Sequence, residues 1–268
     1  MLDQNMIRRF YLQGFEDVWD IGRKQIKLDL GERNFIKLNK FRNRLNFRSL
    51  RRYCIHFAPV HVYMTVLNWL MPERVGKKQG ANHAYPIGGE YVIDIDSYLF
   101  WRPHSHYAGV DGVCVGCLSL SGDSTVRLVD KIEENYSDIH IIFSGERGFH
   151  VHVLDFDLRD WTHYNEEDPI KSHEVARYLY TRYLKSACGG FDKHHFTLSV
   201  DVMRVITVPG SLNGDTGLVC SILGSKKEFE RLSISEILWK ARARQYFFNK
   251  EWDTMISHAH PEPSQGGR

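Results

Sequence analysis

Two short strand-like segments joined by a glycine-containing loop constrain the fold of this chain most. Ile139–Phe143 and Phe149–Leu154 are rich in β-branched and aromatic residues, which favour strands, and Ser144–Gly148 lies between them. A third apolar segment, Tyr91–Asp96, has the same character and lies about fifty residues upstream. These segments predict a sheet built from strands that are distant in the sequence.

Helical patterns surround these strands. We expect residues 1–80 to be mainly helical with a break at Ala58–Pro59, residues 76–89 to form a loop, helices over residues 124–135, 173–187 and 234–248, a strand over 200–208, and a turn over 209–217. Strands separated by helices are typical of an α+β (mixed α/β) fold. We expect residues 1–260 to form one domain and residues 261–268 a disordered tail.

The composition excludes several classes of protein. The chain has 268 residues, of which 43% are hydrophobic and 25% charged, as in ordinary globular proteins. It has no run of eighteen apolar residues and no signal-like N-terminus, so we expect no membrane span and a cytoplasmic location. Five cysteines, an odd number, argue against a disulfide framework.

The net charge of +2 conceals an excess of positive charge near the N-terminus. Residues 33–52 hold eight basic and no acidic side chains, with aromatic residues between them. Such a mixture suits a phosphate backbone or a single strand of nucleic acid. It equally suits a solvated basic face above a core-facing aromatic stripe, and the sequence leaves both interpretations open.

Two carboxylates end the strand over residues 91–96. Asp94 and Asp96 alternate along it, so both side chains are expected on one face. Repulsion between them would be relieved by a bound cation, and a pair of divalent ions at a phosphoryl-transfer site is one strong reason to build such a pair. A solvated strand end is the alternative.

A cluster of soft ligands lies between residues 101 and 120. His104, His106, Cys114 and Cys117 could form a closed tetrahedral zinc site, with Cys-x-x-Cys as its firmest part. The alternative is a loop in which these residues are incidental. A zinc hydrolase is disfavoured because no glutamate that could act as a base lies near the two histidines.

Two further segments favour the binding of an anion. In the loop Ser144–Gly148, Gly145 and Gly148 free the backbone to turn its N–H groups toward a ligand, and Arg147 offers a fork of donors. His150 and His152 share a face of the following strand. The strand with Arg204 leads into a turn containing Asn213. A hairpin turn with surface charges is the alternative for the loop.

In this order, the three segments resemble the archaeo-eukaryotic primase superfamily, and specifically its small catalytic subunits. The matching motifs are the Asp-x-Asp strand, Ser144-Gly-Glu-Arg-Gly-Phe-His150, and Pro209-Gly-Ser-Leu-Asn-Gly-x-Thr-Gly217. The zinc-like segment lies where the family has a zinc knuckle. The resemblance covers roughly residues 5–220 and implies a central, mostly antiparallel sheet flanked by helices, with a small zinc-binding insertion.

The resemblance also implies a mechanism. Asp94 and Asp96 would hold Mg²⁺ or Mn²⁺, and primers would be made on single-stranded DNA from NTP or dNTP, with a primase large subunit as a further partner. The implied nucleotide-binding residues are Ser144, Gly145, Arg147, Gly148, His150, Arg204 and Asn213.

The chain departs from the family pattern in two places. The family's third metal-binding Asp aligns with His195, with Asp192 three residues away as its substitute, and a Lys of the late turn becomes Asp215. These changes leave two hypotheses: a template-directed nucleotidyltransferase, or a primase-fold subunit that has lost catalysis and binds nucleic acid or scaffolds a replication complex.

Overall fold

A computed structural model describes residues 2–13, 15, 19–32, 34–38, 45–76, 81–96, 113–188, 196–198 and 201–243. Antiparallel sheets and several helices make it a mixed α/β protein, as expected. The described strands form two larger antiparallel sheets and a two-stranded one, where the resemblance implied a central, mostly antiparallel sheet. Within the described residues, no helix is long and apolar enough to cross a membrane.

The five-stranded sheet contains the predicted strands. Its order is β11 (Ser221–Gly224), β7 (Ile139–Phe143), β8 (Gly148–Val153), β6 (Tyr91–Asp96) and β9 (Phe196–Leu198). All of its pairings are antiparallel. The predicted hairpin over residues 139–154 and the strand over 91–96 are therefore confirmed, and β6 and β8 lie side by side.

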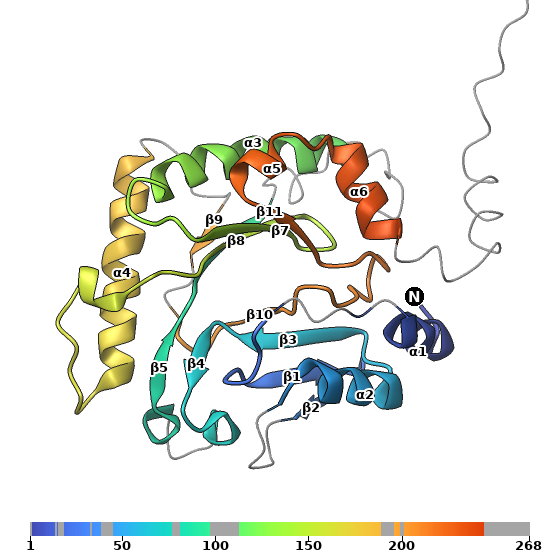
Figure 1. Cartoon of the computed structure of the whole chain (residues 1–268), viewed down its shortest axis with the longest axis horizontal. Helices are drawn as coiled ribbons and strands as arrows, with labels where there is room; N and C mark the ends of the chain where they lie inside the picture. Colours follow the sequence, from blue (N-terminus) through green and yellow to red (C-terminus); the bar gives the residue numbers. More distant parts are fainter. Residues whose placement is uncertain are drawn as a thin grey trace, which may run out of the picture.

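The outer face of this sheet is covered by helices. The helices α3 (Val115–Ile132), α5 (Lys226–Phe229) and α6 (Ile234–Ala243) lie over it, and α4 (Pro169–Ala187) lies at its edge (Figure 1). Ile93 and Ile95 of β6 and Val151 of β8 belong to the hydrophobic core on this side. Helix α3 begins earlier than predicted because the Cys114 sulfur accepts a hydrogen bond from the backbone of Cys117 and caps it.

The N-terminal part is not mainly helical, contrary to the prediction. Its described residues include the α-helices α1 (Gln4–Gln13) and α2 (Phe47–Phe57) and the strands β1 (Ile26–Asp29), β2 (Phe35–Lys37), β3 (His61–Thr65) and β4 (Leu67–Trp69). The strands are only three to five residues long, so their period of two is easily missed. The predicted break at Ala58 is confirmed, because Ala58 ends α2 with a left-handed backbone.

A four-stranded sheet holds this part together. Its order is β10 (Val205–Thr207), β3, β1 and β2, so a strand from late in the sequence pairs with β3. The predicted strand over residues 200–208 is thus confirmed only over its second half. The small sheet pairs β4 with β5 (Pro86–Gly89), which lies within the predicted loop and follows two short 3₁₀ helices, η1 (Pro72–Arg74) and η2 (Ala81–Ala84); a third, η5 (Leu158–Asp160), precedes α4.

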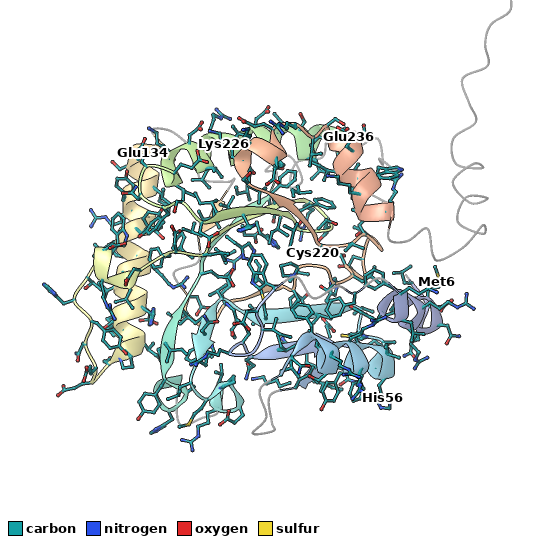
Figure 2. The ribbon with its side chains drawn as sticks, viewed as in Figure 1. Met6, His56, Glu134, Cys220, Lys226 and Glu236 are labelled. Carbon is teal, nitrogen blue, oxygen red and sulfur yellow. The ribbon has the colours of Figure 1, made fainter. Side chains whose placement is uncertain are left out.

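The second core belongs mainly to the N-terminal part and reaches the five-stranded sheet. It joins residues of α1, α2, β1 and β3 with Val92 of β6 and Val219, which precedes β11. Figure 1 shows the segment around β10 passing between the two layers. Cys220, labelled in Figure 2, marks the place where this segment continues to β11, and its side chain is buried. The inner face of the five-stranded sheet therefore faces the β10 segment.

Candidate active site

Strand alternation places the two carboxylates on the inner face. Asp94 lies opposite His150, and Asp96 lies opposite Gly148, in the β6–β8 pairing. The intervening Ile95 is fully buried in the core on the helix side. The prediction that Asp94 and Asp96 share a face is therefore confirmed by the register.

Asp94 is in contact with two predicted site residues. Its Oδ2 accepts a hydrogen bond from Arg204 Nη2 at 2.7 Å, and its Oδ1 lies 3.6 Å from His150 Nε2. Burial raises the pKa of Asp94, against the lowering effects of Arg204 and Arg147. Burial, helped by His152 and Arg204, lowers the pKa of His150 to about 3. The resemblance implied that Arg204 binds the nucleotide, and in the structure its guanidinium group is hydrogen-bonded to the Asp94 carboxylate.

Asp96 has no such partner among the residues that the structure describes. Its carboxylate makes no hydrogen bond or ion pair with any residue in the described ranges. Burial and the charge of Asp94 raise its pKa to about 6, more than Arg147 and Arg204 lower it. A carboxylate whose charge is disfavoured by its surroundings is stabilised by a nearby cation.

The loop between β7 and β8 is built on two glycines. Gly145 has φ +86°, and a Cβ at Gly148 would lie 1.8 Å from the carbonyl oxygen of Ile95. The Ser144 hydroxyl oxygen accepts hydrogen bonds from the backbone N–H groups of Glu146 and Gly148, each at 3.3 Å. Since the oxygen is the acceptor in both, the hydroxyl proton is left to donate to a ligand.

The late turn packs against this loop. Thr216 Oγ1 donates a hydrogen bond to the carbonyl oxygen of Gly145. The side-chain oxygen of Asn213 accepts from the backbone N–H groups of Asp215 and Thr216, at 3.0 and 3.3 Å. The structure therefore brings the third predicted segment to the site, with the Asn213 oxygen used to shape the turn.

Two further acidic residues lie at the site: Glu146 in the loop, which sequence reasoning did not assign a role, and Asp215 in the late turn, which it named as a departure from the family pattern. Glu146 Oε1 is 3.1 Å from Arg147 Nε, and Asp215 Oδ2 is 3.5 Å from His61 Nε2. The pKa of Glu146 is raised by burial first, and also by Asp215 and Asp96, so these carboxylates are electrostatically coupled. The sequence signal for this pair of carboxylates is the presence of an acidic residue in both the loop and the turn.

A buried network lies further along the same face. Glu90, which directly precedes β6, accepts a hydrogen bond from Lys24 Nζ at 2.6 Å and pairs with Nδ1 of His152. Arg177 Nη2 donates to the backbone carbonyl of Glu90 at 2.6 Å. Sequence reasoning noted His152 but missed Glu90 and Lys24, because nothing in the sequence pairs residues so far apart.

The zinc and third-ligand predictions fall largely outside the described residues. His104, His106, Asp192 and His195 all lie there. Cys117 is buried and Cys114 is half-buried, in the first turn of α3. Within the described ranges, no group of three or more His, Cys, Asp or Glu residues is arranged to hold a metal.

Comparisons with known proteins agree with the resemblance that the motifs indicate. No family model matches the chain. It is similar to proteins named DNA primase small subunit PriS: 27% identical to that of Pyrobaculum calidifontis, over 82% of this chain and 79% of the relative; 25% identical to that of Pyrobaculum arsenaticum, over 86% and 80%.

One solved structure matches this chain over most of its length. The polymerase domain of ligase D from Mycobacterium tuberculosis, in complex with DNA, is 10% identical with a TM-score of 0.48, and the match covers 90% of this chain and 87% of that one. The sequence matches confirm the expected resemblance.

Proposed function

We propose that this chain, which resembles DNA primase small subunits, is a template-directed nucleotidyltransferase that makes RNA or DNA primers on single-stranded DNA. One observation supports this most: Asp94 and Asp96 share a face of β6, and the loop Ser144–Gly148 and Arg204 converge on them. Sequence similarity to primase small subunits supports the same reaction class.

The donor set fits a hard divalent cation. Carboxylate oxygens are the ligands that Mg²⁺ and Mn²⁺ prefer. Asp94, Asp96, Glu146 and Asp215 carry four carboxylates against the two guanidinium groups of Arg147 and Arg204, so added positive charge would stabilise the site. Bound there, Mg²⁺ or Mn²⁺ would neutralise charge on the nucleotide's phosphates. His195 and Asp192 remain the candidates for a third ligand.

The other site residues would bind and orient the nucleotide. The Ser144 hydroxyl can donate to a phosphate oxygen, and Arg147 would share its donors between Glu146 and a phosphate. The neutral imidazole of His150 can donate a single proton beside Asp94 without adding charge. Arg204 would fix the orientation of the Asp94 carboxylate. Gly145, Gly148 and Asn213 would shape the backbone around these groups.

The remaining expectations stay part of the proposal. His104, His106, Cys114 and Cys117 would hold a structural zinc ion, which metal analysis of the purified protein would test against a Cys114→Ser/Cys117→Ser variant. The basic residues of the N-terminal part would contact the template. A primase large subunit is the further protein partner. NTP and dNTP are both candidate substrates.

The reaction is tested by primer synthesis. With a single-stranded template, NTP or dNTP, and Mn²⁺ or Mg²⁺, the protein should yield oligonucleotides. Asp94→Asn and Asp96→Asn should each lower the rate by at least a hundredfold while leaving the melting temperature close to that of the wild type. Asp123→Asn is the matched control, since Asp123 is an exposed carboxylate on α3. No product with any metal and template would refute the proposal.

A second function is favoured by the acidic residues of the loop and the late turn. Glu146 and Asp215 would repel a triphosphate, and at an effective dielectric constant of about 20 one such repulsion at ~5 Å is on the order of 3 kcal/mol. A subunit without catalysis would bind single-stranded DNA in a salt-dependent way. It would show no thermal stabilisation by NTP with Mn²⁺. A large thermal shift with NTP would exclude this second function.

A further inference from the structure

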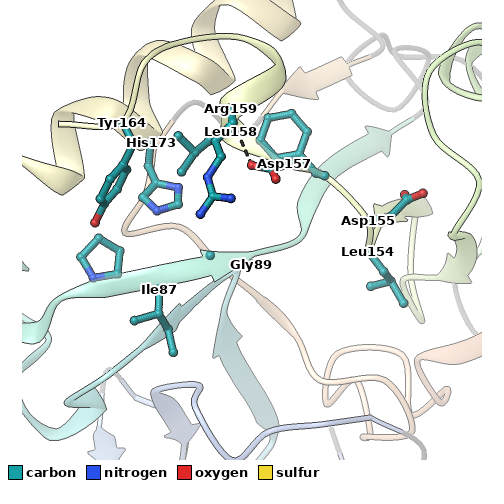
Figure 3. A pocket seen from close by; sticks show the side chains of 12 residues that line it. Ile87, Gly89, Leu154, Asp155, Asp157, Leu158, Arg159, Tyr164 and His173 are labelled. Atoms are coloured by element: carbon teal, nitrogen blue, oxygen red, sulfur yellow. Dashed lines mark hydrogen bonds between the residues drawn. The ribbon is translucent and has the colours of Figure 1, made fainter. Parts of the chain in front are cut away.

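A pocket of about 520 Å³ lies away from the carboxylate pair. It is formed where β5 meets β6 and is covered by the segment after β8 and by the start of α4 (Figure 3). Gly89 lines the pocket and precedes Asp94 by five residues. At ~3.3 Å per residue along a strand, roughly 17 Å separates them. The volume is in the range typical of sites for small molecules.

Three polar side chains point into this pocket. Figure 3 shows Tyr164, His173 and Arg159 side by side above β5. His173 is 3% exposed, yet its ring makes no hydrogen bond with any residue that the structure describes. The guanidinium group of Arg159 likewise has no partner among the described residues; only its backbone N–H donates, to Asp157. Side chains held together without partners are available to a ligand.

The opposite wall is apolar and open. Pro86 lines the pocket, and a Cβ built on Gly88 would meet no atom within 4 Å, while the Ile87 side chain lies on the other side of β5 (Figure 3). Together with the rings of Tyr164 and His173, this wall suits a flat aromatic ring. Burial, with a smaller effect of Arg177, lowers the pKa of His173 to about 4, so its imidazole is neutral at pH 7 and can both donate and accept a hydrogen bond.

The charge of the pocket limits how much negative charge its ligand can carry. Arg159 is the one lysine or arginine among the described residues that line it, and Asp157 lies at the same mouth. The Asp155 carboxylate is already used, because it accepts hydrogen bonds from Ser137 and from the backbone of Asp138. Asp157 Oδ1 likewise accepts a hydrogen bond from the backbone N–H of Arg159. With one guanidinium group beside these two carboxylates, the pocket disfavours a triphosphate more strongly than a single phosphate.

We infer that this pocket binds one nucleotide unit with a single phosphate, with the base against Tyr164 and His173 and the phosphate at Arg159. A free nucleoside monophosphate and a nucleotide within a single strand both present this chemistry. The site is separate from Asp94 and Asp96, so the inference does not depend on the proposed catalysis.

The test uses 2-aminopurine, whose fluorescence is quenched when it stacks. The full-length protein is titrated with 2-aminopurine nucleoside monophosphate, and separately with an oligothymidylate that carries one internal 2-aminopurine. Quenching is expected with at least one probe. Tyr164→Ala should weaken that binding by on the order of tenfold, as for other base–aromatic stacks, and Arg159→Gln by a similar factor. Both side chains are exposed, so folding should be retained.

Two controls make the result decisive. Tyr178→Ala removes an exposed tyrosine of α4, the helix that carries His173, outside the pocket, and should leave binding unchanged. Asp94→Asn should also leave it unchanged. Binding of the free nucleotide identifies a nucleotide site, and binding of the oligonucleotide alone identifies a strand site. Absence of quenching with both probes, or equal loss in Tyr164→Ala and Tyr178→Ala, would overturn the inference.

Discussion

At the scale of single residues, burial decides what the carboxylate pair can do. One oxygen of Asp94 accepts a hydrogen bond from Arg204, while the Asp96 carboxylate has no partner within the described residues. Burial and the neighbouring charge then make the ionised form of Asp96 costly. On an exposed strand end, water and salt would screen the repulsion between the two carboxylates, so a bound cation would stabilise the pair much less.

The titration of Asp96 gives a first prediction. Its pKa is about 6 in the folded protein against 3.8 for an ordinary aspartate, so between these pH values the folded state holds a proton that the unfolded chain releases. This contribution to stability is fully present below about pH 4 and is lost as the pH rises through 6. In metal-free protein, urea unfolding at a series of pH values should show the loss, and Asp96→Asn should reduce it.

The effect of Mn²⁺ on the melting temperature tests whether a cation binds at this pair. Above pH 6, Mn²⁺ should raise the melting temperature of the wild type and have a much smaller effect on Asp96→Asn, because a ligand that binds only the folded state stabilises it. Glu236→Gln, which changes an exposed carboxylate on α6, is the control. An equal effect of Mn²⁺ on the wild type and Asp96→Asn would contradict a cation at this pair.

At the scale of elements, the end of the β6–β8 pairing sets the position of the site. Gly148 lies opposite Asp96, and its missing side chain lets the two backbones approach. Any larger residue at position 148 would collide with backbone atoms of Ile95 and Asp96, which cannot rotate away. The glycine is therefore required by the sheet as well as by the loop.

Gly148→Ala should accordingly destabilise the protein by several kcal/mol, because strand separation rather than side-chain movement is needed to fit the methyl group. Gly116→Ala is the matched substitution. A Cβ at Gly116 has no neighbour closer than 4.0 Å, and in a helix the change should be neutral or stabilising by up to about 1 kcal/mol. Chemical denaturation of both variants checks this, and equal stabilities would show that the predicted collision is absent.

Capping of α2 gives a smaller effect. The side chain of Asn46 accepts a hydrogen bond from the backbone of Ser49, and the Ser49 hydroxyl accepts one from the backbone of Asn46. Asn46→Ala should lower the free energy of unfolding by about 1 kcal/mol. Arg52→Gln, a nearby change that does not touch the cap, should leave it within about 0.5 kcal/mol in the same assay.

These elements differ in how far the sequence predicts them. The strands over residues 91–96 and 139–154 have local patterns strong enough to predict both the strands and the shared face of Asp94 and Asp96. The short strand Ile26–Asp29 depends on pairing with residues 61–65, and no local pattern contains that partner. The contact between Arg204 and Asp94 depends on the same kind of long-range pairing, so only the structure reveals it.

At the scale of the whole molecule, a buried ion pair connects the parts that carry the two sheets. Lys24 lies just before β1 of the four-stranded sheet, and Glu90 lies just before β6 of the five-stranded one. Both side chains are almost fully buried, and Lys24 Nζ also donates to the carbonyl oxygen of Val66 at 2.8 Å. His152, on the strand that carries His150, also contacts the Glu90 carboxylate through its Nδ1. The relative position of the two sheets therefore depends on a charge that water does not screen.

Glu90→Gln should consequently lower the free energy of unfolding by about 3–5 kcal/mol, because it leaves the charge of Lys24 buried without its carboxylate. The pH dependence separates this charge effect from a packing effect. The pKa of Glu90 is lowered to about 2: burial raises it, but Lys24 and His152 lower it by more. Its contribution to stability is therefore present above about pH 4.5 and is lost as the pH falls toward 2.

The double variant Lys24→Met/Glu90→Gln removes both charges and should regain part of the lost stability, since the cost lies in the unpaired charge. Stability measured by urea unfolding between pH 3 and 7 should fall less steeply with acid in both variants than in the wild type. If Glu90→Gln follows the acid dependence of the wild type, or if the double variant is less stable than Glu90→Gln, the ion pair does not hold the two sheets together.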